Sequence, residues 1–213
     1  MKKTLVGAII MCLLVGVSFA DSTKAKQIIK ALQEERQGLE KQRKKYDRRL
    51  AALINQRRKL ECSYQSCISF VGHGLDELTL QVDDERNLME EEWKKFLEQK
   101  KRLDIKNQSL EIHRKNIELQ FKGKERGVEY DDKISEYASL FRQEYLLPYR
   151  ELLGKYEHYI SGMISYFEIV RDLTEVCQNK KGLKSINSSN IESKIDTMKT
   201  STDEIFLLNK NKK

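Results

Sequence analysis

The sequence has few of the residues that interrupt helices. One proline and ten glycines occur among 213 residues, while 34% of the residues are charged. Sheets and tight turns need more turn-forming residues than this, so the composition argues against a β-rich fold and predicts long helices. Beyond residue 20, no apolar run approaches the roughly 20 residues of a transmembrane helix. We therefore expect no membrane span once the N-terminal segment is removed.

The common motifs of catalysis and cofactor binding are also missing from the sequence. His73, His113 and His158 are dispersed, and none belongs to a His-Glu-x-x-His or Glu-x-x-His pair. Neither a glycine-rich phosphate loop nor a Gly-x-Ser-x-Gly elbow occurs. The acidic runs at residues 83–85 and 90–92 lack the glycine turn of a calcium loop. We predict no catalytic residue, no cofactor and no metal site, and a protein that is not an enzyme.

The longest apolar run lies at the start of the chain. Lys2 and Lys3 precede an apolar stretch from Leu5 to Val17, which is followed by a small-x-small sequence ending at Ala20. This order predicts a cleavable signal peptide over residues 1–20. Its apolar stretch rises only about 20 Å as a helix, against a hydrocarbon core of roughly 30 Å, so a permanent anchor fits poorly. The short charged start is typical of bacteria, and we expect a periplasmic or secreted mature protein.

Three long stretches place apolar residues at every seventh position, and these stretches cover residues 22–61, 74–122 and 129–178. The first two each carry one seam, whereas the third carries three adjacent lanes. The two seams are formed by Ala25, Leu32, Leu39, Tyr46, Leu53 and Leu60, and by Leu75, Val82, Met89, Phe96, Leu103, Leu110 and Ile117. This pattern predicts an all-α fold: an elongated antiparallel three-helix bundle or coiled-coil hairpin over residues 21–178, with the third helix at its centre.

The second stretch carries an additional apolar lane in its distal half. Ile105, Ile112 and Leu119 lie two positions beyond members of the seam, which is about 200° round a helix. We therefore expect this half of the helix to contact partners on two sides. Trp93 stands next to the seam rather than on it. It is our candidate contact surface if it is exposed, and otherwise it covers the third helix.

The third stretch holds most of the aromatic residues. Seven of the nine tyrosines lie between Tyr130 and Tyr166. Their helical spacing favours packing in the core over an aromatic surface that binds protein or glycan. Pro148 should bend or break this helix near Leu147, because proline removes a backbone donor and clashes with the preceding turn.

The C-terminal part of the sequence changes composition. Residues 179–190 are rich in Asn, Lys, Ser and Gly, which predicts a flexible linker. A short amphipathic helix is predicted over residues 191–208, with a disordered tail at residues 209–213. The apolar side of that helix consists of Ile191, Ile195, Met198, Thr202 and Ile205.

Charge is distributed unevenly along the chain. Without Lys2 and Lys3 the chain carries 38 basic and 33 acidic side chains, an excess too small to indicate nucleic-acid binding. Residues 41–59 contain nine basic side chains and one acidic, whereas residues 76–94 contain eight acidic and two basic. These runs face each other in an antiparallel hairpin whose facing residue numbers sum to about 135. The alternative is that the basic run binds an anionic surface.

Three cysteines remain once Cys12 has left with the signal peptide: Cys62, Cys67 and Cys177. An odd number leaves one thiol over in an oxidising compartment. Cys62 and Cys67 can pair within the first connection if the backbone between them is not helical. Alternatively, the antiparallel third helix brings Cys177 level with the same connection, where it can pair with Cys62 or Cys67. The sequence does not decide between these pairings.

These patterns together predict an exported helical protein that binds another protein, in a secretion, conjugation or cell-surface assembly. The export signal and the three long helices resemble the minor pilus subunits of type IV secretion systems in architecture only, because no motif matches residue by residue. The alternative function is a periplasmic holdase chaperone for exported proteins. A parallel coiled-coil dimer, and hence a homo-oligomer, is the main structural alternative to the hairpin.

Overall fold

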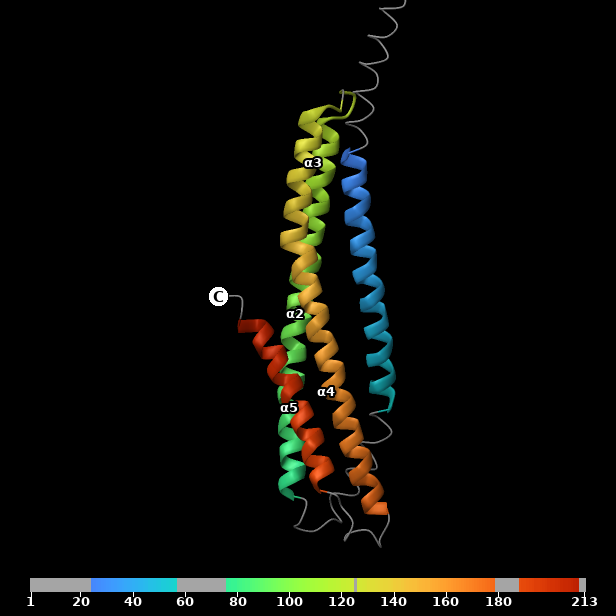
Figure 1. Cartoon of the computed structure of the whole chain (residues 1–213), viewed down its shortest axis with the longest axis vertical. Coiled ribbons are helices and arrows are strands. Elements are labelled where there is room, and N and C mark those ends of the chain that lie inside the picture. The colour runs from blue at the N-terminus through green and yellow to red at the C-terminus, as the bar shows by residue number, and fades with distance from the viewer. Residues whose placement is uncertain (1–23, 57–75, 125, 179–187, 211–213) are drawn as a thin grey trace, which may run out of the picture. The chain divides into compact units, whose positions relative to one another are not determined.

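The computed structural model describes residues 24–56, 76–124, 126–178 and 188–210 (Figure 1). These residues are almost entirely helical, and no strand occurs among them. Residues 24–56 form the first helix. It is followed by α2 (Asp76–Gln120), α3 (Val128–Phe141), the π-helix η1 (Arg142–Leu146), α4 (Leu147–Gln178) and α5 (Ser188–Lys210). The all-α prediction is confirmed.

The chain divides into two compact units. The described part of unit 1 comprises residues 24–40 of the first helix, residues 101–120 of α2, the turn that follows, α3, η1 and α4 as far as Arg150. The described part of unit 2 comprises residues 41–56, residues 76–100 of α2, the rest of α4 from Glu151, and α5.

In unit 1 a tight turn joins α2 to α3. The backbone at Gly123 has a φ of 78°, a left-handed conformation that glycine adopts without the steric cost of a side chain. Beyond the turn, Phe121 and Tyr130 meet edge to face with ring centroids 5.4 Å apart. Lys106 of α2 forms an ion pair with Glu144 of η1. From the first of these contacts to the second, the residue number falls from 121 to 106 on the α2 side and rises from 130 to 144 along α3 and η1. These helices therefore run antiparallel.

Helix η1 lies directly before Pro148. The Leu147 N–H donates to the Arg142 carbonyl, five residues back instead of four. A proline at position 148 cannot donate to residue 144, and its ring would clash with that carbonyl in a regular α-helix. One widened turn relieves both problems, since π-turns accommodate an additional residue within a helix. The predicted disturbance near Leu147 is therefore a local π-turn, and α4 continues beyond it to Gln178.

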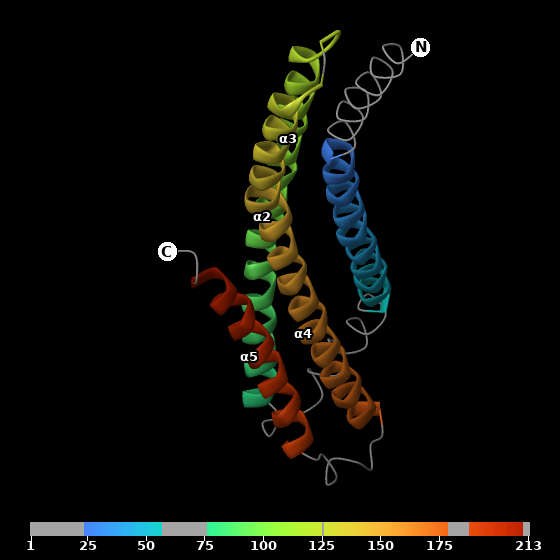
Figure 2. The same cartoon turned by 45° about the horizontal axis from the view of Figure 1, so that its top comes forward.

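In unit 2, α5 lies alongside α2 and α4 (Figures 1 and 2). The three helices approach one another closely at Gly162 of α4. A Cβ atom built at Gly162 would lie 2.8 Å from Met89 Cε and 3.3 Å from Ser201 Cβ. The absence of a side chain at this position thus permits the close approach. Lys194 of α5 forms an ion pair with Asp172 of α4 near the start of α5.

The predicted seams form the cores of both units. The third helix is the most deeply covered, since all seven tyrosines from Tyr130 to Tyr166 are buried, as are the described side chains of its three lanes. The buried seam residues of the other two helices are Ala25, Leu32, Leu39, Tyr46, Val82, Met89, Phe96, Leu110 and Ile117. Leu53 and Leu103 are half-buried, and Leu60 and Leu75 lie outside the described residues. Core packing of the tyrosines is confirmed.

The predicted boundaries need adjustment at the C-terminal end. Helix α5 begins at Ser188 and ends at Lys210, so it takes three residues from the predicted linker and two from the predicted tail. The rest of the linker, residues 179–187, and the end of the tail, residues 211–213, lie outside the described residues. All five residues of the predicted apolar side of α5 are buried. Their packing against the rest of unit 2 stabilises a longer helix than local composition indicates.

Candidate functional site

The clearest surface feature of unit 1 is the second apolar lane of α2, for which the sequence predicts contact with a partner on a second side of the helix. Ile105, Ile112 and Leu119 are 58%, 59% and 64% exposed. That part of the prediction is wrong: α3 and the first helix cover only the opposite side of α2, where Leu110 and Ile117 are buried. We call Ile105, Ile112 and Leu119 the exposed lane.

Polar and basic residues border the exposed lane. Lys101, Gln108, Lys115 and Lys122 recur every seven residues on one side of it, and all four are exposed. On the other side lie Arg102, Ser109 and Asn116, which are exposed as well. Within residues 101–120 of α2 the exposed acidic residue is Asp104, which lies beyond the lysine side of the lane. The face therefore combines an apolar stripe with positive charge.

Trp93 belongs to an aromatic cluster in unit 2 that we define as Tyr46, Trp93, Phe96, Tyr156 and Tyr159. The indole of Trp93 stacks on Phe96 and on Tyr159, each with ring centroids 4.4 Å apart. Tyr156 lies 5.0 Å from the indole and 5.4 Å from the Tyr46 ring. The indole is half-buried, so it covers α4 and holds the first helix, α2 and α4 together instead of projecting as a contact residue.

Two hydrogen bonds join the edge of the aromatic cluster to the start of the basic run. The Tyr156 hydroxyl donates to Asp47 Oδ1 at 2.9 Å, and the Tyr46 hydroxyl donates to Glu157 Oε2 at 2.9 Å. Burial and the bond to Asp47 raise the pKa of Tyr156. Residues 41–56 thus contact α4 through specific side chains. The predicted pairing of the basic run with residues 76–94 stays a prediction, and residues 57–59 lie outside the described residues.

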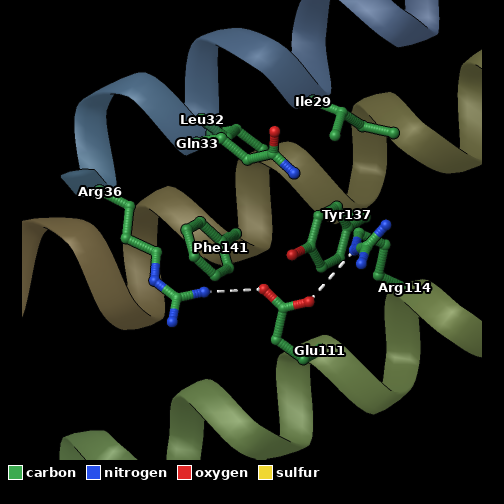
Figure 3. Close-up of a pocket in the computed structure, with 8 residues that line it drawn as sticks. All are labelled: Ile29, Leu32, Gln33, Arg36, Glu111, Arg114, Tyr137 and Phe141. Carbon is green, nitrogen blue, oxygen red and sulfur yellow. Dashed lines mark hydrogen bonds and ion pairs between the residues drawn. The ribbon is translucent and has the colours of Figure 1, made fainter.

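A small cavity lies in unit 1 between the first helix, α2 and α3 (Figure 3). Its volume of about 20 Å³ is enough for one water molecule. Hydrophobic groups form much of the wall, and charged groups of α2 and the first helix close one side of it. The lining residues are Ile29, Leu32, Gln33, Arg36, Glu111, Arg114, Tyr137 and Phe141.

Glu111 organises the charged side of this cavity. Arg36 Nη1 lies 3.0 Å from one carboxylate oxygen of Glu111, and Arg114 Nε lies 3.2 Å from the other. The two arginines also pair with Glu40 and Glu118, respectively. Burial opposes the charge of Arg36, but the hydrogen bond and the negative charge of Glu40 outweigh it and raise the pKa of Arg36. The carboxylate therefore joins two permanent cations on different helices.

The Arg36–Glu111 pair also fixes the register of the first helix against α2 in unit 1. The two residue numbers sum to 147, whereas the register predicted from the charge runs is near 135. The observed pair is therefore displaced by twelve residues. Charge complementarity between long runs is satisfied over many registers, while the buried side chains on either side of this ion pair pack in one of them.

Tyr137 and Tyr145 stand close to these charges in unit 1. Burial raises the pKa of each phenol to about 12, and the negative charge of Glu111 contributes at Tyr137. Both phenols are therefore protonated at neutral pH, and neither can act as a base there. The cavity thus combines a compensated ion network with protonated phenols, an arrangement suited to fixing helices in register and to holding a water molecule.

The remaining site predictions fall partly outside the described residues. Cys62 and Cys67 lie outside them, and Cys177 lies on α4 next to its last residue. The disulfide stays a prediction. Within the described ranges, no three His, Cys, Asp or Glu side chains are grouped to hold a metal ion. None of the described helices is both long and apolar enough to cross a membrane.

Comparisons with known proteins add no relative. No protein-family model, no curated protein and no solved structure matches this chain. The candidate site therefore depends on geometry alone, and the exposed lane is the feature that geometry supports best. Sequence periodicity located this lane and predicted that it is covered, whereas its side chains are exposed in unit 1. The Glu111 network was missed, because residues 75 positions apart in the chain give no local signal.

Proposed function

We propose that this chain is an exported helical protein that binds another protein, and that the exposed lane of α2 is part of the binding surface. The observation that carries this proposal is the exposure of Ile105, Ile112 and Leu119 at seven-residue spacing on one face. Isolated apolar side chains are common on protein surfaces and need no partner. A regular row on a single helix face is the pattern by which helices recognise each other.

The surrounding structure supports a surface that is ready to bind. On its opposite side, α2 is held by Leu110 and Ile117 in the core and by the ion pairs of Glu111. The helix therefore needs no refolding to present the lane, and a preformed surface costs less entropy on binding. The N-terminal signal pattern over residues 1–20 supports a partner in the periplasm or outside the cell.

Site-specific photocrosslinking in the native cell tests the proposal. A photoreactive amino acid replaces Ile112, and the exported protein is irradiated before purification. We expect a discrete crosslinked product that contains a second protein, identified by mass spectrometry. Replacement of Glu136, which is exposed on α3 of the same unit, provides the matched control and should give no such product. Crosslinks at both positions alike, or at neither, would contradict a binding role for the lane.

A further inference from the structure

The chemistry of the exposed lane identifies the kind of partner that fits it. We propose that the lane docks an acidic amphipathic helix of another protein, with apolar residues at seven-residue spacing and carboxylates beside them. This inference rests on the proposed function and names the partner class of the same surface. Three observations lead to it: the width of the apolar stripe, the charge beside it, and the poor fit of a second copy.

The stripe is narrow. Ile105, Ile112 and Leu119 supply one exposed apolar residue in each heptad, and the flanking positions on both sides are polar or basic. A helix that lies on a membrane needs a broad apolar face to enter the interfacial region. A single row at a spacing of seven instead matches the groove of another helix, which follows the same period as the two wind round each other. The shape therefore favours a helix.

The charge beside the stripe is basic along the full length of the lane. Lys101, Lys115 and Lys122 share one side with Gln108, and Arg102 begins the other. The acidic residues of this part of α2 that lie nearest the core, Glu111 and Glu118, pair with arginines of the unit itself. In helix pairs, the residues that flank the apolar seam select the partner by opposite charge. Lysines at this position select carboxylates.

A second copy of the chain is a poor occupant for the same reason. In an antiparallel pair centred on Ile112, the lysine side of one copy meets the lysine side of the other, with Lys101 close to Lys122. In a parallel pair, the same lysines meet Arg102, Ser109 and Asn116. Neither arrangement places a carboxylate at the positions that border the lane directly, because Asp104 lies farther round the helix than the lysines, and like charges beside a seam are unfavourable. Self-association through this lane is therefore disfavoured.

Binding of synthetic helices to the full mature protein tests the inference. The acidic probe is a labelled peptide with leucine at every seventh position and glutamate on both sides, and the basic probe carries lysine in place of glutamate. Fluorescence anisotropy should show at least about tenfold tighter binding of the acidic probe at low salt, with affinity falling as salt rises. The variant with Ile105→Gln, Ile112→Gln and Leu119→Gln should lose at least about tenfold in affinity.

Charge reversal provides the matched variant. The protein with Lys101→Glu, Lys115→Glu and Lys122→Glu should reverse the preference and bind the basic probe more tightly. All six positions are exposed, so both triple variants should retain the helical circular dichroism and the melting temperature of the parent. Equal binding of the two probes overturns the inference. A dimer of the parent protein that the glutamine variant abolishes also overturns it. So does binding to anionic vesicles that depends on the lane, if the acidic probe does not bind.

The two proposals fail in distinguishable ways. A protein crosslinked through position 112, together with no preference between the probes, would retain the proposed function and discard the acidic helix as its partner. Absence of a specific crosslink together with no probe binding would discard both. A crosslinked protein whose contact region is an acidic helix, together with reversal of the probe preference, supports both.

Discussion

Burial raises the pKa of Tyr137. The stability of the folded protein therefore decreases as the pH rises through the alkaline range. The pKa of Tyr137 is about 12 in the folded protein against an ordinary value near 10. Between these values the unfolded chain loses the phenolic proton while the folded chain keeps it. Stability from this group is therefore fully present below pH 10 and is lost as the pH rises toward 12. Burial likewise raises the pKa of Tyr145 to about 12, so Tyr145 contributes in the same direction.

Urea unfolding at pH 9 and pH 11 measures this effect. Each tyrosine should reduce the free energy of unfolding by about 1 kcal/mol between these two pH values. The Tyr137→Phe variant removes one titrating group and should lose correspondingly less than the parent over the same interval. Lysine titration affects both proteins equally and cancels in the comparison. An identical pH-dependent loss in parent and variant would show that the Tyr137 phenol does not titrate with a raised pKa.

At the residue scale, the sequence predicted burial better than it predicted contacts. Tyr137 and Tyr145 were assigned to the core because their helical spacing shows which face they share, and both are buried. Periodicity contains no information on what lies across that face. The proximity of Glu111 to Arg36 and to Tyr137 follows from the packing of three helices. Trp93 shows the same limit, since its position beside a seam fits either exposure or stacking.

At the element scale, the close packing of α5 against α2 and α4 depends on Gly162, although glycine is an unfavourable residue inside a helix. Gly38 and Gly162 both lie inside helices, where glycine costs roughly 1 kcal/mol relative to alanine. Nothing lies within 4 Å of a Cβ built at Gly38, whereas one at Gly162 meets Met89 and Ser201. The two glycines therefore form a matched pair that separates helix propensity from packing.

Gly38→Ala should raise the free energy of unfolding by about 0.5–1 kcal/mol. Gly162→Ala should gain less, because the side chain of Met89 must move away from the new methyl group. Gly162→Leu should destabilise the protein by about 1–3 kcal/mol through overpacking, and it should accelerate amide hydrogen exchange in residues 188–210. Chemical denaturation and hydrogen-exchange mass spectrometry provide the two measurements. Equal stabilisation by both alanine substitutions would refute the close approach at Gly162.

The helices themselves were predictable because their signals are local. Val82, Met89 and Phe96 repeat at a spacing of seven, and each is buried as that spacing predicts. The ends of α5 were less predictable, since Ser188 and Lys210 belong to a helix whose stability comes from contacts with α2 and α4. The seven-residue spacing of the exposed lane was visible in the sequence. Whether another helix covers such a row depends on how many helices pack around α2, and periodicity does not contain that information.

At the scale of the whole molecule, the compartment and the redox state of the chain are linked predictions. The predicted cleavage after Ala20 would remove Cys12 and leave Cys62, Cys67 and Cys177 in the oxidising environment expected for an exported protein. One disulfide among three cysteines leaves one free thiol. The mature protein should therefore begin at Asp21 and react with iodoacetamide at a single cysteine when no reductant is present.

Intact-mass analysis and peptide mapping of the exported protein test this prediction. If the local pair forms, the alkylated residue is Cys177; if α4 is bridged to the first connection, it is Cys62 or Cys67. The same chain produced without residues 1–20 in a reducing cytoplasm serves as the control and should be alkylated at all three positions. The Ala20→Asp variant should retain the leader, because the cleavage site requires a small residue. An exported protein that keeps its first twenty residues, or one with three reactive thiols, would contradict the link between export and a disulfide.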